Sequence, residues 1–378
     1  MRILRVGVMI LGLPLLWAAA PAGNAPDPVL RLTPTGEAPQ EAPLRPPVLA
    51  ATPAPPPPPS FALQKISYPG NVTATFAQVY GNLRGFRPLT LDLYQPPGRS
   101  GGLPLLVFVH GGGWNGGDTR HAASFTDFPR ELAGLAARGY VVASVSYRLS
   151  GEARFPAAVQ DIKAAIRWLR AHSTDLGIDP TRVAVWGDAA GGQLAALVGV
   201  TCGVTPFEPD AKDNGALPSD CVQAVIDWGG TTDLQSLAAG TQAPAEAKAG
   251  AGFQPPPNSD AGDFLGCEPA RCPPMVARLA SPMTYISATS PPFLIQHGGA
   301  DSEIPSSQSQ KLYDALRQAN VPAELMIYPG TGHNFTRDGR PDTAALQAAR
   351  EKLVAFLAAT FPPVPIGPKI AQPRGSLY

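Results

Sequence analysis

Three positions of this 378-residue sequence have residue types and an order suited to acyl transfer. Ala189 lies at the centre of the segment Gly187–Gly191, and Asp301 and His333 follow it along the chain. One class of hydrolytic enzymes uses a nucleophile, an acid and a base in this order. Asp301 would hold the imidazole of His333 in one tautomer, and His333 would move the proton. The order therefore predicts a catalytic triad whose nucleophile position is residue 189.

The side chain at position 189 is a methyl group, which can neither attack a carbonyl carbon nor donate a proton. Covalent acyl transfer would therefore lack its starting group. Ser144 and Ser146 belong to an earlier predicted strand and residues 191–193 are Gly, Gly and Gln, so no nearby serine can replace it. A deliberate substitution of a serine and a natural loss of it are both open, and the intact acid and base favour the first.

A second glycine-rich segment, His110-Gly-Gly-Gly-Trp114, directly follows the apolar run 105–109. Consecutive glycines let backbone N–H groups approach a ligand closely. Such donors stabilise the negative charge that develops in the transition state of acyl transfer. The position after a buried strand favours an oxyanion hole over a plain glycine-rich turn. We expect His110 to tie this loop together by hydrogen bonds rather than to act as a base.

The chain around these segments alternates between predicted strands and helices. Residues 89–94 alternate apolar and polar side chains, as a half-buried strand does. Continuous apolar runs, typical of strands buried on both faces, occur at 105–109, 141–145, 183–186, 222–226, 293–295 and 325–328. Helices are predicted at 156–172, from the helical spacing of its apolar residues, and at 190–200. This alternation predicts an α/β fold with a mostly parallel central sheet, helices on both faces, and the site at the carboxyl ends of the strands.

From about residue 61 to residue 362 the chain resembles the bacterial acetyl-, feruloyl- and formamidase-type esterases of the α/β-hydrolase superfamily. It is also similar to the hormone-sensitive-lipase-like carboxylesterases, which share a His-Gly-Gly-Gly loop. The matching segments are His110–Asp118, Ile178–Gly187 and Ser281–Tyr285, the last leading to Asp301. The resemblance implies the α/β-hydrolase fold and a serine at the position that Ala189 occupies.

The same resemblance implies which residues would bind the ester. The oxyanion donors would be the backbone N–H groups of Gly112, Gly113 and Ala190. Trp114 and Trp228 would line the acyl or alcohol pocket. Burial of both in the core is an equal alternative, because tryptophan is usually heavily buried.

Together these residues imply a secreted carboxylic-ester hydrolase scaffold that uses a Ser-His-Asp acyl-enzyme route on a small or aromatic ester. With Ala189 it would bind the ester and scarcely hydrolyse it. A ligand-binding pseudoenzyme and an amide or formamide hydrolase are the alternatives. No cofactor and no metal is expected. The 29 basic and 29 acidic residues, without a Lys/Arg-rich run, argue against a nucleic-acid partner.

The N-terminal residues resemble an export signal. Arg2 and Arg5 precede about 14 apolar residues, too few to span a bilayer as a helix, and small residues follow. We therefore expect a secreted or periplasmic protein with no membrane anchor after signal cleavage. Fourteen prolines between residues 21 and 60 disfavour helix and sheet there. The predicted organisation is a signal peptide at 1–22, a disordered linker at 23–60, an α/β-hydrolase domain at 61–362 and a C-terminal tail at 363–378.

The four cysteines form two pairs that are close in sequence. In an exported protein this spacing predicts the disulfides Cys202–Cys221 and Cys267–Cys272. A metal site is the poorer interpretation, because no histidine is close in sequence to either pair. Residues 235–257 are rich in Ala, Gly and Pro, and we expect them to form a mobile loop over the mouth of the pocket.

Overall fold

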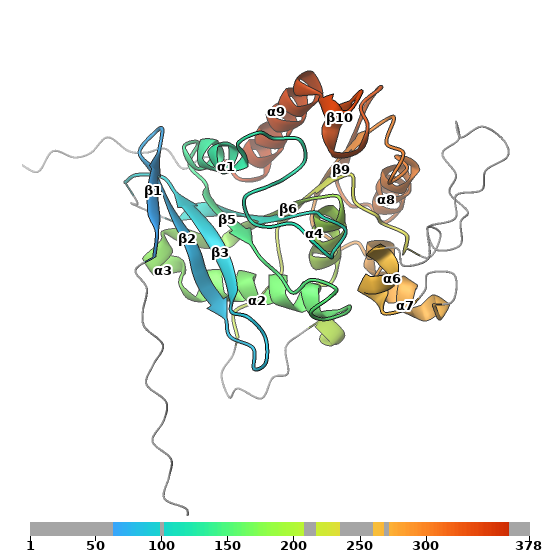
Figure 1. Cartoon of the computed structure of the whole chain (residues 1–378), viewed down its shortest axis with the longest axis horizontal. Helices are drawn as coiled ribbons and strands as arrows, with labels where there is room; N and C mark the ends of the chain where they lie inside the picture. Colours follow the sequence, from blue (N-terminus) through green and yellow to red (C-terminus); the bar gives the residue numbers. More distant parts are fainter. Residues whose placement is uncertain (1–62, 99–101, 208–216, 235–259, 268–271, 363–378) are drawn as a thin grey trace, which may run out of the picture. The chain divides into compact units, whose positions relative to one another are not determined.

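A computed structural model describes residues 63–98, 102–207, 217–234, 260–267 and 272–362 (Figure 1). All of them belong to one compact unit, Ser60–Tyr378. The predicted signal peptide, linker and C-terminal tail lie outside the described residues, and so does the loop predicted at 235–257.

Among these described residues, nine strands form one sheet in the order β1-β2-β3-β5-β4-β6-β7-β8-β9. Their bounds are β1 (Lys65–Tyr68), β2 (Val72–Gly81), β3 (Leu89–Gln95), β4 (Leu103–Val109), β5 (Val141–Val145), β6 (Ile178–Asp188), β7 (Ala224–Trp228), β8 (Phe293–Gly298) and β9 (Ala323–Tyr328). The pairs from β1 to β5 in this order are antiparallel, and every pair from β5 to β9 is parallel. The predicted mostly parallel sheet is confirmed. A separate two-stranded ribbon joins β10 (Thr336–Arg337) and β11 (Arg340–Pro341).

Helices cover both faces of the sheet. Their bounds are α1 (Phe128–Ala136), α2 (Ala157–Ala171), α3 (Ser173–Leu176), α4 (Ala190–Val200), α6 (Asp260–Leu265), α7 (Pro274–Leu279), α8 (Ser307–Gln318) and α9 (Thr343–Thr360). Short 3-10 turns are η1 (Thr205–Phe207), η2 (Pro282–Tyr285) and η3 (His333–Phe335). No helix in the described part of the chain is long and apolar enough to cross a membrane.

Each central strand contributes to two separate hydrophobic cores. On β4, Leu105, Val107 and Val109 pack in the core that includes α2, α4 and α8. Leu106 and Phe108 point to the other face and pack in the core that includes α1 and α9. Figure 1 shows α1 and α9 on one side of the sheet and α2 on the other. Burial on both faces explains why the central strands are continuous apolar runs in the sequence.

The parallel register brings the carboxyl ends of neighbouring strands together. Val109, the last residue of β4, pairs with Gly187 of β6. Asp188, at the end of β6, pairs with Trp228 at the end of β7, and Trp228 pairs with Gln296 of β8. The loops that leave these strands therefore meet at one edge of the sheet, where ligands bind in open α/β folds.

Both predicted disulfides are present. Cys202 bonds to Cys221 and Cys267 to Cys272, each with an S–S distance of 1.98 Å. The first joins the segment after α4 to the segment before β7, and the second joins the residues that follow α6 to those that precede α7.

Candidate active site

Ala189 forms a sharp turn between the last residue of β6 and the first residue of α4. Its backbone angles are φ 48° and ψ −117°, a conformation that residues with side chains rarely adopt. Its N–H donates to the carbonyl oxygen of Trp228 at 2.8 Å. The side chain is buried. Position 189 therefore has the strained strand-to-helix geometry of a nucleophile elbow.

The glycines on either side of Ala189 are required by close backbone contacts. A Cβ atom on Gly187 would collide with the carbonyl oxygen of Gly191, and one on Gly191 would collide with the carbonyl oxygen of Val109. Crowding by the backbone therefore excludes side chains at positions 187 and 191. The turn thus depends on these glycines and on the β6–α4 connection, whatever side chain stands at position 189.

The glycine-rich loop after β4 lies directly against the elbow. Asp188 holds it there, because one carboxylate oxygen accepts from the N–H of Gly111 and the other from the N–H of Ala123, each at 2.9 Å. Burial raises the pKa of Asp188 to about 6, although these hydrogen bonds oppose the rise. A Cβ atom on Gly111 would lie 3.4 Å from the Cβ of Ala189. No local sequence pattern indicates this role of Asp188.

The three predicted oxyanion donors belong to the two segments that meet here. Gly112 and Gly113 have φ values of 98° and 60°, a region that favours glycine. A Cβ atom would also collide with the carbonyl oxygen of Gly116 at the first position and with the carboxylate of Asp260 at the second. The carbonyl oxygen of Gly112 accepts from the N–H groups of Asn115 and Gly116, which closes the turn. Ala190 is the first residue of α4, and N–H groups in the first turn of a helix have no partner within it. These N–H groups thus belong to the two segments that lie next to position 189.

His110 ties this loop together, as its predicted role requires. Its Nδ1–H donates to the carbonyl oxygen of Gly111 at 2.8 Å, and its ring stacks on Tyr147. The hydroxyl of Tyr147 donates to the carbonyl oxygen of His110 at 2.9 Å. Burial lowers the pKa of His110 to about 4, so the ring is neutral at neutral pH.

Asp301 and His333, which are 32 residues apart, form a hydrogen-bonded pair. His333 Nδ1 donates to Asp301 Oδ2 at 2.8 Å. The other oxygen, Oδ1, accepts from the N–H groups of Glu303 and Ile304 at 2.9 and 2.8 Å. Asp301 follows β8 and His333 begins the turn after β9. This arrangement leaves Nε2 of His333 as the basic nitrogen.

The surroundings shift the acidity of both groups. Burial lowers the pKa of His333, but the hydrogen bond and charge of Asp301, together with the charges of Glu303 and Asp188, outweigh burial and raise it above its ordinary value. Burial raises the pKa of Asp301, but hydrogen bonds from His297 and His333 hold it well below its usual range. The pair is therefore arranged to stabilise a protonated His333 beside an ionised Asp301.

A cavity of about 10 Å³, enough for about one water molecule, lies between this pair and Asp188, the residue before Ala189. Asp188, Asp301 and His333 all line it. Trp228 lines it too, and its Nε1 donates to Gln296. The structure thus brings the neighbour of Ala189 and the predicted acid and base to one place.

Both predicted substrate-binding tryptophans are buried, with Trp114 5% and Trp228 2% exposed. The ring of Trp114 stacks on Phe264 of α6, and its Nε1 donates to Gln193 of α4 at 2.9 Å. Trp114 therefore has the surroundings of a core residue, whereas Trp228 lies at the small cavity described above.

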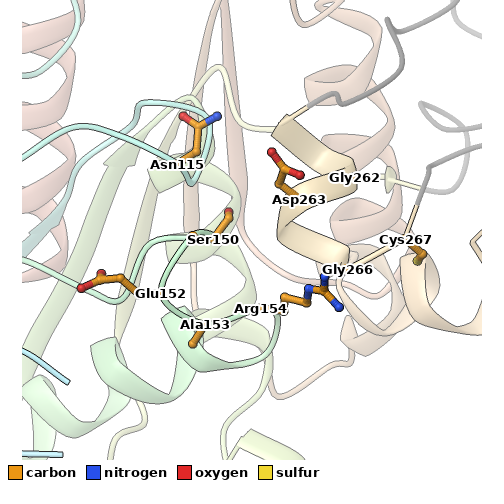
Figure 2. A pocket seen from close by; sticks show the side chains of 10 residues that line it. Asn115, Ser150, Glu152, Ala153, Arg154, Gly262, Asp263, Gly266 and Cys267 are labelled. Carbon is orange, nitrogen blue, oxygen red and sulfur yellow. The ribbon is translucent and has the colours of Figure 1, made fainter. Parts of the chain in front are cut away.

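A much larger cavity, of about 810 Å³, opens beside the glycine-rich loop (Figure 2). It lies between α6 and the loop that contains Ser150 and Arg154. The described residues around it are small or polar: Asn115, Ser150, Gly151, Glu152, Ala153, Arg154, Gly262, Asp263, Gly266 and Cys267. Asn115 directly follows Trp114 and donates to Asp260 at 2.6 Å. This cavity was not predicted, because its walls come from segments far apart in the sequence.

Within the described ranges, no group of three or more His, Cys, Asp or Glu side chains could hold a metal ion.

Comparison with known proteins gives consistent matches. The family model described as BD-FAE matches residues 91–316, and the model of the prolyl oligopeptidase family matches residues 274–362. The probable carboxylic ester hydrolase LipM of Mycobacterium tuberculosis is 30% identical over 274 residues, which cover 71% of this chain and 58% of LipM. Esterase LipC of the same organism is 30% identical over 237 residues, which cover 61% of this chain and 53% of LipC.

Two solved structures share the fold. A truncated carbohydrate esterase from gut microbiota has a TM-score of 0.60 and 25% identity, over 76% of this chain and 95% of the other. An esterase of Thermogutta terrifontis has a TM-score of 0.58 and 28% identity, over 77% and 94%.

The chain belongs to the α/β-hydrolase superfamily, and within it to the carboxylesterase family of the hormone-sensitive-lipase type. It spans little more than half the length of the curated relatives named above.

Proposed function

We propose that this protein is a carboxylesterase scaffold that binds a carboxylic ester and whose turnover is impaired by Ala189. One observation carries the proposal. Ala189 has the strained backbone conformation typical of a nucleophile elbow, with φ 48° and ψ −117°, and His333 forms a hydrogen bond of 2.8 Å with Asp301. These features support a site that lacks only the attacking hydroxyl of acyl transfer.

With serine at position 189, each remaining part has a defined task. The serine Oγ would attack the ester carbonyl while Nε2 of His333 takes its proton. Backbone N–H groups of Gly112, Gly113 and Ala190 would stabilise the oxyanion. His333 would return the proton to the departing alcohol, and a water activated by His333 would release the acid.

The cavity of about 810 Å³ supports a hydrophilic alcohol group in the substrate. None of the described residues around it has a large apolar side chain, and Figure 2 shows Asn115, Ser150, Glu152 and Asp263 around it. We therefore propose a short acyl group esterified to a hydroxylated alcohol. The similarity to a carbohydrate esterase supports this substrate class.

We further propose that the protein is exported, as the N-terminal sequence predicts. The two disulfides support this proposal, because disulfides persist mainly in oxidising compartments. A ligand-binding pseudoenzyme is the main alternative to an impaired esterase, and the ordered His333–Asp301 pair disfavours it, because binding alone does not need that pair.

Comparing the Ala189 protein with Ala189→Ser tests the proposal. We expect Ala189→Ser to hydrolyse p-nitrophenyl acetate several orders of magnitude faster, because loss of a triad serine costs about a million-fold in a well-studied protease. The matched control is Ala189→Ser combined with His333→Gln, which has the hydroxyl but no base. Background rates from a folded Ala189→Ser protein would support the pseudoenzyme instead.

A further inference from the structure

A second histidine, His297, contacts the carboxylate that holds His333. It lies near the end of β8, four residues before Asp301, and its side chain is fully buried. Its Nε2 is 3.3 Å from Asp301 Oδ2, the same oxygen that accepts from His333 Nδ1 at 2.8 Å. One carboxylate oxygen therefore faces two imidazole rings.

Hydrogen bonds fix both the orientation and the tautomer of His297. Its Nε2 lies 2.8 Å from the carbonyl oxygen of Ile304, which can only accept, so Nε2 carries a proton. Its Nδ1 lies 2.7 Å from Oγ of Ser309 on α8, and in the neutral ring this nitrogen accepts a hydrogen bond from the hydroxyl. The Nε2–H group thus donates to the Ile304 carbonyl, and Asp301 Oδ2 lies 3.3 Å from the same nitrogen.

His297 is the one side chain besides His333 that restrains Oδ2 of Asp301 among the described residues. The two backbone N–H groups that bind Oδ1 come from residues 303 and 304, in the same short loop as Asp301. They fix one oxygen and leave the carboxylate free to tilt about it. His297 contacts the other oxygen, Oδ2, from a strand of the central sheet rather than from the loop.

The direction of Asp301 Oδ2 matters because a second carboxylate, that of Glu303, competes for the ring proton of His333. Its Nε2 lies 3.7 Å from Oε2 of the exposed Glu303. A neutral imidazole has one proton, which can be on Nδ1 beside Asp301 or on Nε2 beside Glu303. Only the first tautomer leaves Nε2 unprotonated and able to accept a proton from a hydroxyl at position 189.

The other charged groups near these rings are acidic. Asp188, at the end of β6, interacts electrostatically with His333, and Asp227, on β7, interacts electrostatically with His297. Neither forms a hydrogen bond with a histidine ring among the described contacts, so Asp301 and Glu303 are the acceptors that decide the tautomer of His333.

We propose that His297 is a positioning residue of this site. Its Nε2–H holds Asp301 Oδ2 in line with Nδ1 of His333, and so keeps His333 in the tautomer with a free Nε2. The geometric part of the proposal, that His297 positions Asp301 and His333, rests on contacts in the Ala189 protein itself. The catalytic part, the effect on turnover, rests on the proposed function.

Nitrogen-15 NMR of histidine-labelled protein tests the geometric part without any activity. The chain has five histidines, so the ring signals can be assigned by single substitutions. Above the pKa of His333, we expect the Nδ1–H tautomer of this ring in the unaltered chain and a mixture with the Nε2–H tautomer in His297→Phe. His297→Gln, whose amide can still donate, should retain the Nδ1–H form. His172→Phe, which removes an imidazole bonded to the Trp168 carbonyl, should leave His333 unchanged.

The catalytic part is tested in the Ala189→Ser background. We expect His297→Phe to lower kcat about tenfold or more while KM stays within about twofold, because a triad histidine in the wrong tautomer loses up to about 10⁴-fold in kcat. His297→Gln should recover part of the loss. Should His297→Phe not fold, Ser309→Ala, which removes the donor to Nδ1, replaces it in both measurements.

An unchanged His333 tautomer in a folded His297→Phe protein would overturn the positioning role. Inactivity of Ala189→Ser with a tautomer change in His297→Phe would refute the proposed function and leave the positioning role intact. A tautomer change without any change in kcat would confine His297 to structure and overturn its catalytic consequence.

Discussion

Replacing Ala189 by glycine should lower the free energy of unfolding less than an ordinary alanine-to-glycine substitution does, or should raise it. With φ 48° and ψ −117°, Ala189 is strained, and relief of such strain is worth about 1–3 kcal/mol. Two effects oppose it: the loss of a buried methyl group, about 0.8 kcal/mol, and the greater entropy of glycine in the unfolded chain, about 0.4–1 kcal/mol. The net change in the free energy of unfolding lies between a loss of about 1 and a gain of about 2 kcal/mol.

Ala190→Gly is the matched control. Ala190 is the next residue, is equally buried, and has helical geometry as the first residue of α4. It has no strain to release, so its substitution should cost about 1.8 kcal/mol, the sum of the helix-propensity penalty and the lost methyl group. The penalties common to both variants nearly cancel in the comparison, and the remaining difference of about 1–3 kcal/mol measures the strain at position 189.

Urea unfolding of the three proteins, followed by tryptophan fluorescence and circular dichroism, gives the free energies. We expect Ala189→Gly to be more stable than Ala190→Gly by about 1–3 kcal/mol. Equal losses in the two variants would show that the turn is not strained. The elbow geometry would then be wrong, and a serine at position 189 would not be presented to His333.

Three further predictions concern pH, charge and disulfides. The activity of Ala189→Ser should rise with pH as His333 loses its proton. The midpoint should lie above the ordinary histidine pKa of about 6.5, because Asp301, Glu303 and Asp188 favour the protonated ring. A midpoint below that value would contradict the claim that these carboxylates raise the pKa of His333. Glu303→Gln should move this midpoint to lower pH, whereas Glu351→Gln, a change on the exposed side of α9, should leave the whole profile in place. Denatured, non-reduced protein should contain no thiol that reacts with iodoacetamide. Cys202→Ser combined with Cys221→Ser should lower the free energy of unfolding by about 3 kcal/mol, the chain-entropy value for the loop that this disulfide closes. An unchanged free energy of unfolding would argue against the Cys202–Cys221 bond.

The central strands could be predicted because they are buried on both faces, which makes each one a continuous apolar run. Their ends were less predictable. β6 begins at Ile178 rather than 183, because residues 179–182, which follow the buried Ile178, are half-buried or exposed and break the apolar run. β7 is shifted by two residues to 224–228, because Asp227 is buried in spite of its charge.

The first two strands, β1 and β2, were not predicted. β1 is mostly exposed, so it has no apolar pattern. In β2 the pairing with β3 shifts between Thr75 and Gln78, and Ala77 has a positive φ. This bulge interrupts the alternation of buried and exposed side chains that would have marked a strand.

The order of the triad positions could be predicted from the sequence, whereas the residues that support them could not. Asp188 bonds to Gly111 and Ala123, which are 77 and 65 residues away, and no local pattern indicates such partners. His297 and Asp301 are four residues apart but belong to a strand and a loop, so their contact depends on how that loop turns back. The large cavity likewise depends on α6 packing beside the loop that contains Ser150.

Covalent labelling by a p-nitrophenyl phosphonate ester tests the central claim most directly. A serine hydroxyl activated by His333 attacks phosphorus and expels p-nitrophenolate, and the phosphonylated protein has a higher mass. We predict that Ala189→Ser gains one phosphonyl group, mapped to Ser at position 189 by peptide mass spectrometry, and that the Ala189 protein and Ala189→Ser combined with His333→Gln gain none. A folded Ala189→Ser protein without the adduct, or an adduct on another serine, would contradict the claim that position 189 is the nucleophile position of an otherwise intact esterase site.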